Sequence, residues 1–319
     1  MSLKQKKIKV GVLGYTSELS KELKSFIEEE GLFEELRFNF YDLNAKDDYS
    51  ILGDFRDESI VVKYPKIDEL KTNDILILTS NLPQNEDIVK LYKDGIVIDI
   101  ADSLDEYSLL YSGEEKDTLK NSRIIKLPQP ASFILYKILT PIKKSFGLEW
   151  ALSNVFFPAS SKEGGIDNFL DQILNSLNMK PINKEVFNEQ IAFSFAPIEE
   201  EVERKIEEET RKLLGMREVG VESFFASVFH SFSFFIHFKT LKPIEEDIFK
   251  YSFEVENFFR FSRKRLTSPI EAAGNNKIEL SFLRKVKDME NTYFFNASAD
   301  NFKAGIILSV VEILKKLTE

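Results

Sequence analysis

The chain of 319 residues contains no cysteine. This absence excludes disulfide bonds, thiolate metal sites and a cysteine nucleophile at the same time. Histidine is nearly absent as well: His230 and His237 fall on opposite faces of one predicted strand, so we expect no dedicated transition-metal site. The sequence has no run of ~20 apolar residues, and residues 8–13, behind a basic start, are too short for the core of a signal peptide. We therefore expect a cytoplasmic protein that does not bind membranes.

The basic residues are not concentrated in any one segment. The chain carries 43 Lys and Arg against 53 Asp and Glu, a formal net charge of -10, and its longest uninterrupted basic run is residues 263–265. A surface that follows a nucleic-acid backbone needs clustered cations, so we expect no nucleic-acid partner. The length exceeds what one hydrophobic core usually supports, which predicts two domains of roughly 150 residues each.

The first half of the chain alternates short apolar runs with amphipathic segments. Strands are predicted at residues 7–13, 36–41, 74–80 and 95–100, and helices at residues 19–27 and 85–93. Apolar runs of this length are typical of strands that are buried on both faces of a parallel sheet. The pattern predicts a Rossmann-like, doubly wound α/β domain that ends near residue 125.

The second half is predicted to be an α+β domain rich in sheet. Helices are expected at residues 131–146, where Pro141 would kink the helix, at residues 198–215, and at residues 302–317. A capping box of Ser160 and Glu163 predicts a further helix, whose apolar stripe consists of Ile166, Phe169, Leu170, Ile173, Leu174 and Leu177. Strands are expected at residues 190–195, 224–239, 251–255, 277–282 and 293–298.

The longest uninterrupted strand pattern, residues 226–239, contains both histidines. Period-two alternation places His230 at the start of an otherwise apolar face, which continues with Phe232, Phe234, Ile236 and Phe238. A histidine there is either a hydrogen-bonded core or rim residue or a functional group, and the strand alone does not decide. The opposite face includes Phe235 and needs a cover, so we expect a homodimer that forms through this sheet.

Gly14 lies between the first strand and the first helix, where a dinucleotide phosphate can approach backbone amides. Ser17 and Ser20 stand at the three-residue spacings where glycines are usual. Gly14 is therefore either part of a phosphate-binding turn or only a turn residue.

On the predicted helix 198–215, Glu209 falls in the middle of the apolar stripe and Lys212 at its edge. A carboxylate that faces inward needs a partner. Glu209 therefore either forms a structural ion pair, for instance with Lys212, or lines a polar cavity.

Several segments, in this order, resemble the aspartate-semialdehyde dehydrogenase family. The matching segments are KVGVLGYTSELSKEL from Lys9, QIAFSFAP from Gln190, EETRKLLG from Glu208, HSFSFFIHF from His230, SPIEAAG from Ser268 and DNFKAGIIL from Asp300. The resemblance implies a nucleotide-binding domain at residues 1–130 and 302–319. It also implies a catalytic-like domain at residues 131–301, whose large mixed sheet forms a homodimer. The family reduces an acyl phosphate with NADPH through a cysteine thioester.

The resemblance implies roles for particular residues. His230 corresponds to the acid/base histidine of the family, and Glu209 and Lys212 to its substrate-contacting glutamate and lysine. The nucleophilic cysteine falls on Pro130, with Gln129 in place of an asparagine. A proline offers neither a nucleophile nor an amide donor.

Other family positions are changed as well. The arginine that grips the substrate carboxylate falls on Ser223, the phosphate-binding arginine falls near Asp105, and the glutamine that orients the chemistry falls near Phe156. The second glycine-rich turn of the family falls on residues 80–82, and the nearest hydroxyl to the lost nucleophile is that of Ser132.

The cofactor implied by the resemblance is NADP or NAD, held by Gly14, Thr16, Ser17, Ser20 and Asp42. The two serines narrow the phosphate turn. Asp42 follows the second strand, where a carboxylate suits the ribose of NAD and repels the 2′-phosphate of NADP. We expect weak or absent binding of NADP.

Three functions are compatible with these residues. The first is a catalytically inactive homologue, a pseudoenzyme retained as a binding or interaction protein. The second is an NAD(P)-dependent oxidoreductase that transfers hydride without a covalent intermediate, with His230 as general acid/base. The third is a sensor of a small anionic metabolite, whose pocket uses Glu209 and Lys212.

Overall fold

The computed structural model describes residues 7–29, 36–45, 51–254, 258–262 and 264–318. The chain divides into two compact units. Unit 1 consists of Met1–Pro128 and Ile306–Glu319, and unit 2 consists of Gln129–Gly305.

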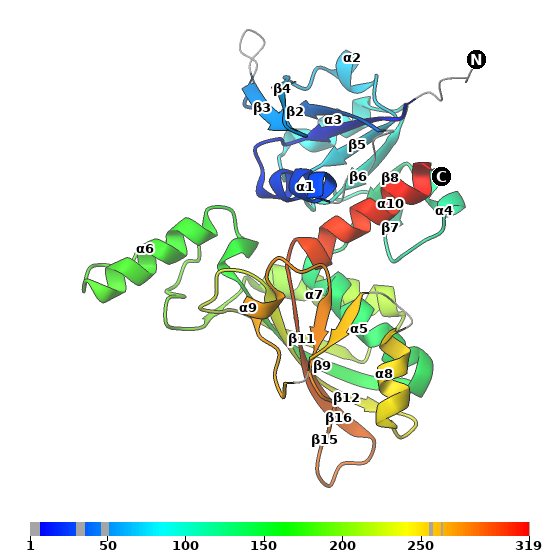
Figure 1. The fold of residues 1–319 in the computed structure, drawn as a ribbon, viewed down its shortest axis with the longest axis vertical. Coiled ribbons are helices and arrows are strands. Elements are labelled where there is room, and N and C mark those ends of the chain that lie inside the picture. The colour runs from blue at the N-terminus through cyan, green and yellow to red at the C-terminus, as the bar shows by residue number, and fades with distance from the viewer. Residues whose placement is uncertain (1–6, 30–35, 46–50, 255–257, 263, 319) are drawn as a thin grey trace. The chain divides into compact units, whose positions relative to one another are not determined.

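Unit 1 is built on a six-stranded parallel sheet with the strand order β2-β1-β5-β6-β8-β7 (Figure 1). The strands are β1 (Lys9–Leu13), β2 (Arg37–Tyr41), β5 (Ile75–Leu78), β6 (Ile96–Asp99), β7 (Leu109–Leu110) and β8 (Ile124–Lys126). The helices are α1 (Glu18–Glu29), α2 (Ile67–Leu70), α3 (Gln84–Leu91), α4 (Lys116–Lys120) and α10 (Leu308–Thr318). All four residues of β5 are buried, as a strand in the middle of a parallel sheet requires. The predicted doubly wound α/β fold is confirmed.

A small hairpin, β3 (Ile51–Phe55) with β4 (Glu58–Val62), completes unit 1 and was not predicted. Its two turn residues, Arg56 and Asp57, have φ values of 54° and 57°. Positive φ at both positions gives the strand-twisting turn that two-residue hairpins prefer. Gly53 and Asp54 interrupt the alternation of apolar and polar residues in β3, so the sequence pattern did not indicate this strand.

Unit 2 contains an eight-stranded mixed sheet with the order β10-β11-β9-β12-β16-β14-β13, and β15 also pairs with β16. The strands are β9 (Leu148–Phe157), β10 (Ala196–Pro197), β11 (Val219–Phe225), β12 (Phe232–Thr240), β13 (Phe259–Phe261), β14 (Ile278–Leu280), β15 (Arg284–Lys285) and β16 (Thr292–Ala299). The helices are α5 (Pro130–Phe146), η1 (Ala159–Ser161), α6 (Gly165–Leu177), α7 (Glu200–Leu214), α8 (Glu246–Glu254), α9 (Pro269–Ala272) and the π-helical turn η2 (Lys303–Ile307). The predicted helices 131–146 and 198–215 are confirmed, and the predicted helix 302–317 is η2 followed by α10. Pro141 lies inside α5, and the kink there stays a prediction.

The two faces of the unit 2 sheet differ in burial. In the central strand β12, the side chains of Phe232, Phe234, Ile236 and Phe238 are buried in one core. That core also includes residues of α5, α7 and α8. On the opposite face, Phe235 is half-buried and His237 is exposed. The alternation predicted for this strand is therefore correct from Phe232 onward.

The predicted strand 224–239 is wrong in its first half. Strand β11 ends at Phe225 and β12 begins at Phe232, so residues 226–231 form a connection between strands instead. Ser231 has a φ of 74°, and its amide donates to Oδ1 of Asn301 at 3.1 Å. These features turn the chain before β12. His230 is exposed in this connection and does not begin the apolar face.

Two other predicted strands are also wrong. Residues 190–195 form a loop because the side-chain oxygen of Gln172, on α6, accepts the amides of Ile191 (2.9 Å) and Ala192 (3.2 Å). Residues 251–254 belong to α8, where Phe249 and Phe253 are four residues apart on the buried face and their ring centroids are 4.9 Å apart. Residue 255 lies outside the described part of the chain.

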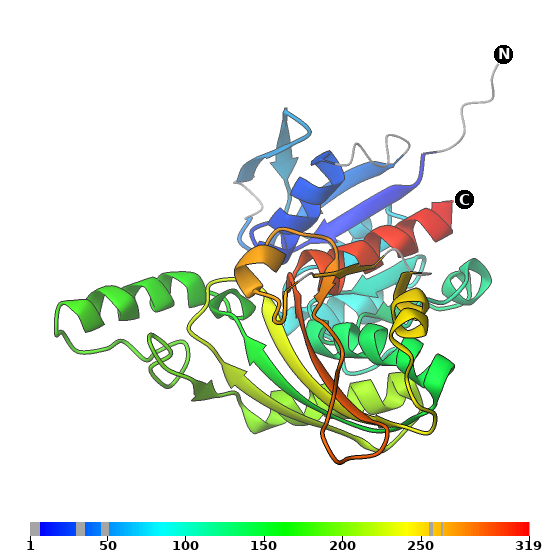
Figure 2. The ribbon, with the colours of Figure 1, turned by 60° about the horizontal axis from the view of Figure 1, so that its bottom comes forward.

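The predicted capping box is absent from the start of α6. Ser160 belongs to η1, and its hydroxyl contacts Oδ1 of Asn301. The helix begins at Gly165, where a Cβ would lie 2.0 Å from the carbonyl oxygen of Ala159, so this position accommodates only glycine. Along α6 the predicted stripe is only partly covered, since Leu174 and Leu177 are exposed. The helix extends away from the rest of unit 2 in both views (Figures 1 and 2).

Helix α7 closes part of the edge of strand β11. Its carboxylates Glu203 and Glu207 accept the amides of Ser223 (2.6 Å) and Val221 (3.1 Å). One turn further, Nε of Arg211 donates to the carbonyl of Val219 at 2.8 Å. These three side chains are spaced four residues apart, so they lie on one face of the helix.

Candidate functional site

The turn after β1 is tightly packed against the end of β5. Gly14 has a φ of 102°, and a Cβ on it would lie 2.5 Å from Oγ of Ser80. The hydroxyl of Thr79 contacts the carbonyls of Leu13 and Gly14, each at 2.9 Å. Gly14 is therefore required by backbone conformation and by close approach, whether or not a phosphate binds there.

Asp42 forms hydrogen bonds inside unit 1. Its carboxylate accepts the amide and the hydroxyl of Thr16, both at 2.8 Å, and the amide of Asn44 at 2.8 Å. The side chain is buried. These contacts tie the loop after β1 to the loop after β2, and they occupy the carboxylate that would otherwise receive ribose hydroxyls.

The two serines of the turn are also accounted for locally. Ser17 Oγ accepts the amide of Ser20 at 3.1 Å, which caps the start of α1, and Ser20 is fully buried. Dinucleotide turns instead place glycines here, so that the backbone can approach the pyrophosphate. Together with the occupied carboxylate of Asp42, this turn does not fit a dinucleotide in the usual way.

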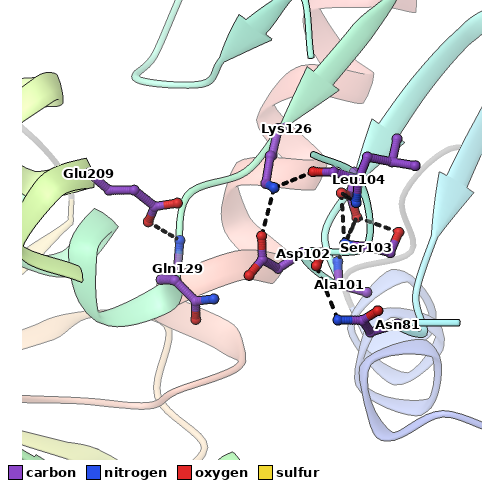
Figure 3. Close-up of polar contacts among 9 residues, drawn as sticks. Asn81, Ala101, Asp102, Ser103, Leu104, Lys126, Gln129 and Glu209 are labelled. Atoms are coloured by element: carbon purple, nitrogen blue, oxygen red, sulfur yellow. Dashed lines mark hydrogen bonds and ion pairs between the residues drawn. The ribbon is translucent and has the colours of Figure 1, made fainter. Parts of the chain in front are cut away.

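A buried charge cluster lies at the ends of strands β6 and β8 (Figure 3). The carboxylate of Asp99 is fully buried and accepts hydrogen bonds from Ala101, Ser103 and Leu104. Burial raises the pKa of Asp99 above its ordinary value, against the opposing effect of these hydrogen bonds and of Lys126. The sequence analysis missed this cluster, although a charged residue at the end of an apolar strand was a signal.

Lys126 is the cation of this cluster. Its ammonium group forms an ion pair with Asp102 Oδ1 at 2.7 Å and donates to the carbonyl of Leu104. Asn81, after β5, donates to the carbonyl of Asp102 at 3.1 Å. Asp105, near which the resemblance places the family's phosphate-binding arginine, is exposed on the same loop.

The start of α5 in unit 2 contains Pro130, to which the resemblance assigns the nucleophile position. Pro130 is the first residue of the helix, and a Cβ on Gly305 would lie 3.0 Å from its Cβ. The preceding amide, that of Gln129, donates to Oε2 of Glu209 at 2.7 Å (Figure 3). Glu209 is buried, as its place in the apolar stripe of α7 predicted, and one partner of its carboxylate is a backbone amide.

Ser132 does not replace the nucleophile. Its side chain is fully buried, and its hydroxyl donates to the carbonyl of Ile206 on α7 at 3.4 Å. A serine whose hydroxyl faces a helix backbone, without an adjacent base, stays protonated and unreactive.

Three further residues, Ser223, Phe156 and Lys212, are assigned by the resemblance to positions that function in the family. Ser223 is buried within β11, and Phe156 packs against Phe195, Phe224 and Phe235 with centroid distances of 5.5, 5.8 and 5.5 Å. Lys212, one turn after Glu209 on α7, is exposed. Neither Ser223 nor Phe156 offers the charge or amide that the family uses there.

The described residues contain neither a cluster of metal ligands nor a helix that could span a membrane. No group of three or more His, Asp or Glu side chains among them could hold a metal ion. Within the same residues, none of the helices has the length and apolar character needed to cross a membrane.

The strand order of unit 1, the mixed sheet of unit 2 and the return of the chain to unit 1 through α10 define a Rossmann-like α/β unit combined with an α+β unit that has a large mixed sheet. No protein-family model matches the chain. The aspartate-semialdehyde dehydrogenase of Rickettsia bellii (strain RML369-C) is 24% identical over 250 residues, which are 72% of this chain and 74% of that protein.

Solved structures extend this similarity to nearly the whole chain. Aspartate semialdehyde dehydrogenase II from Vibrio cholerae has a TM-score of 0.85 at 18% identity, covering 98% of both chains. A probable aspartate-semialdehyde dehydrogenase from Pseudomonas aeruginosa has a TM-score of 0.83 at 17% identity, also covering 98% of both. The resemblance read from the motifs is confirmed: the chain is similar in sequence to an aspartate-semialdehyde dehydrogenase and has the fold of the solved structures of these enzymes.

Proposed function

We propose that the chain is a catalytically inactive homologue of the aspartate-semialdehyde dehydrogenases that acts as a binding or interaction protein. The observation that carries this proposal is the start of α5, where Pro130, the residue that the resemblance aligns with the nucleophile, begins the helix and Glu209 accepts the preceding amide. A proline cannot form a thioester, and the thioester route has no substitute without its nucleophile.

The changes around this position support the same proposal. The hydroxyl of Ser132 is bonded to α7, and Ser223 cannot supply the charge of an arginine. Each missing guanidinium withholds a charge-assisted hydrogen bond of about 1.5 to 3 kcal/mol, or roughly tenfold or more in rate. Restoring the cysteine alone should therefore not restore activity.

An activity assay tests the proposal directly. The wild type and Pro130→Cys are compared with aspartate semialdehyde, phosphate and NADP, and NADPH formation is followed by absorbance. We expect no turnover from either protein above a reaction without protein. Turnover by the wild type would overturn the proposal, and turnover by Pro130→Cys alone would show that the remaining site is intact.

We also propose that unit 1 retains the form of a nucleotide-binding domain but binds NADP weakly or not at all. The three hydrogen bonds that the carboxylate of Asp42 already accepts and the helix cap of Ser17 support this. Calorimetry with NADP and NAD tests it, and micromolar or tighter affinity for NADP would contradict it. Stabilisation by either cofactor of ~1 kcal/mol or more at saturation would instead favour a hydride-transferring oxidoreductase.

A homodimer through unit 2 completes the proposal. Around Phe156, four half-buried or exposed phenylalanine rings gather on the less covered face of the sheet. Leu152 is 55% exposed on the same face. Contiguous apolar surface of this kind marks interaction sites, and a second copy would cover it.

A further inference from the structure

Two neighbouring cavities open on the less covered face of the unit 2 sheet. One has a volume of about 330 Å³, and its lining includes Trp150, Leu152 and Gly220. The other has a volume of about 350 Å³, and its lining includes Leu152 and Gly220 again, together with His237. Because the cavities adjoin at the same two residues, they form one groove, which we call the Gly220 groove.

The backbone of strand β11 does not require a glycine in this groove. β11 pairs with β9 in one continuous parallel register from Val219 to Phe225, and the φ of Gly220 lies outside the left-handed region. A Cβ on Gly220 would instead lie 2.8 Å from Cδ2 of Leu152. A glycine in the interior of a strand often marks a place where a ligand approaches the backbone closely. Gly220 therefore keeps space open above the sheet.

One end of the Gly220 groove is basic. Arg211 and Arg217 both line the first cavity. Arg211 pairs with Glu207 at 2.7 Å, and Glu218 accepts only the backbone amide of Arg217, at 3.2 Å. The exposed guanidinium of Arg217 has no ion pair among the residues that the structure describes. A guanidinium binds a carboxylate through two parallel hydrogen bonds, so this end suits a carboxylate.

The other end of the groove is acidic. Glu222 and Asn154 line the second cavity and are direct neighbours across the pairing of β11 with β9. Neither side chain has a hydrogen-bond partner within the described part of the chain. His237 closes this end from β12, and its ring is stacked on that of Phe294 at a centroid distance of 5.4 Å. A carboxylate, an amide oxygen and a neutral imidazole are acceptors that suit an ammonium group.

The middle of the groove is apolar. Side chains on one face of a strand repeat every two residues, so Trp150, Leu152 and Asn154 on β9 are spaced roughly 7 Å apart. Leu152 is 55% exposed between the two charged ends. A ligand that contacts both ends must therefore carry its opposite charges at the two ends of an apolar chain.

We propose that the Gly220 groove binds a linear zwitterion. Its carboxylate pairs with Arg217, its ammonium group with Glu222, and the apolar chain between them covers Leu152. This inference deepens the proposed binding function by naming the ligand class, and it rests on that function.

The aromatic surface that we assign to the dimer occupies a different part of the same face. Its rings gather around Phe156, which is four residues further along β9 than Leu152, or roughly 13 Å. The ligand and a second copy can therefore bind at the same time. A second copy that covered the groove would instead compete with the ligand, and the apparent affinity would fall as the protein concentration rises.

Titration of the full-length protein with ε-aminocaproate tests the inference. Trp150 is the only tryptophan of the chain and lines the groove, so its fluorescence reports occupancy. Caproate lacks the ammonium group, hexylamine lacks the carboxylate, and glycine has both charges without the apolar chain. Calorimetry at two protein concentrations measures the affinity of each compound.

Three variants remove one feature of the groove each. Glu222→Gln removes the anionic end, Arg217→Met removes the cationic end, and Gly220→Ala fills the middle. Glu208→Gln, exposed on α7 and outside the lining of both cavities, is the matched control. Circular dichroism and the thermal midpoint report the folding of each variant.

We expect saturable binding of ε-aminocaproate by the wild type and by Glu208→Gln. Loss of either charge, from the ligand or from the groove, should weaken binding about tenfold or more, because a charge-assisted hydrogen bond is lost. Glycine should bind as weakly as the single-charge compounds. Gly220→Ala should lose binding without a lower thermal midpoint, since alanine is less costly than glycine inside a strand.

Three outcomes would overturn the inference. They are a wild type without saturable binding of ε-aminocaproate, a Gly220→Ala protein that binds it as well as the wild type, and an affinity that falls as the protein concentration rises. The first and third need no variant to fold. None of them affects the activity assay on Pro130, and turnover in that assay would overturn the proposed function without changing these titrations.

Discussion

The two units use carboxylates in the same way but surround them differently. In unit 1, Asp42 and Asp99 gather the amides of neighbouring loops. In unit 2, Glu203 and Glu207 hold the edge of β11, and Glu209 holds the amide before α5. In both units the carboxylate replaces water as the acceptor for backbone groups that the secondary structure leaves unpaired.

The carboxylates of the two units differ in how deeply they are buried and in the cations that lie beside them. Asp99 is fully buried beside the buried Lys126, whereas Glu207 is partly exposed and pairs with the partly exposed Arg211 at 2.7 Å. Partly exposed ion pairs such as Glu207–Arg211 contribute little to the free energy of unfolding, because water screens their charges. Buried carboxylates occur in both units, with Asp42 and Asp99 in unit 1 and Glu209, Glu279 and Asp300 in unit 2, and Asp99 in addition lies near the buried cation Lys126.

Removal of Asp99 should have the largest effect. In Asp99→Ala, the amides of Ala101, Ser103 and Leu104 lose their acceptor, and each buried unpaired group costs about 1 to 3 kcal/mol. We expect the free energy of unfolding to fall by roughly 3 to 5 kcal/mol in urea titrations. Asp105→Ala, on the same loop but exposed, should change it by less than about 0.5 kcal/mol.

The second prediction contrasts exposed leucines in the two units. Leu152→Arg places a charge on the proposed dimer face of unit 2, and we expect a monomer at micromolar concentration in sedimentation, with dimerisation weakened by about 2 to 4 kcal/mol. Leu52→Arg changes a leucine that is 79% exposed on the unit 1 hairpin and should leave the dimer intact. A monomeric wild type would refute the dimer itself. The single tryptophan, Trp150, is two residues from Leu152 and gives an independent fluorescence signal.

Glu209 should matter less than Asp99, since the hydrogen bond described for it joins one amide. We expect Glu209→Ala to lower the free energy of unfolding by about 1 to 3 kcal/mol, because the amide of Gln129 is left without its acceptor. Glu208→Ala, exposed on the same helix, is the matched control. If the two substitutions lowered the free energy of unfolding equally, the carboxylate of Glu209 would have no special role in holding the amide before α5.

The smallest effect concerns pH. Burial raises the pKa of Asp99, so the folded state binds this proton more tightly, and the contribution of Asp99 to stability falls as the pH rises from about 4 through the folded-state pKa. For Glu199, burial acts in the same direction but is outweighed by the hydrogen bond and charge of Lys162, so its pKa is lowered. Its contribution is present above about pH 4 and is lost as the pH falls.

Unfolding of the wild type, Asp99→Asn and Glu199→Gln between pH 3.5 and pH 7 measures these opposite trends. The stability difference between the wild type and Asp99→Asn should decrease with rising pH, while the difference from Glu199→Gln should increase. Two parallel trends would show that the buried and the exposed carboxyl groups do not differ as described.

Much of unit 1 could be predicted because its strands are continuous apolar runs, which need no distant partner to be recognised. Helix α7 and the inward position of Glu209 followed from helical periodicity for the same reason. The loop at residues 190–195 could not be predicted, since its acceptor, Gln172, is on another element. The exposed position of His230 depends on the turn at Ser231, whose amide is bound by Asn301 seventy residues away.

The candidate site was predictable only where a single residue type decides the chemistry. Pro130 excludes a thioester in any conformation, so the loss of the nucleophile was visible in the sequence. The ion pair of Lys126 and Asp102 joins the end of strand β8 to the loop after β6, and neither residue belongs to a recognisable motif. The amide contact of Glu209 likewise required the fold, because Gln129 is 80 residues earlier in the chain.

The side chains of α7 along β11 also limit how this protein can polymerise. Sheets extend into filaments when an unpaired strand edge of one molecule templates the strand of another. Here the amides of Val221 and Ser223 are already occupied by carboxylates, and the carbonyl of Val219 by a guanidinium. An incoming strand would have to displace all three side chains before it gained a hydrogen bond, so this edge is protected against runaway aggregation even when the protein is concentrated.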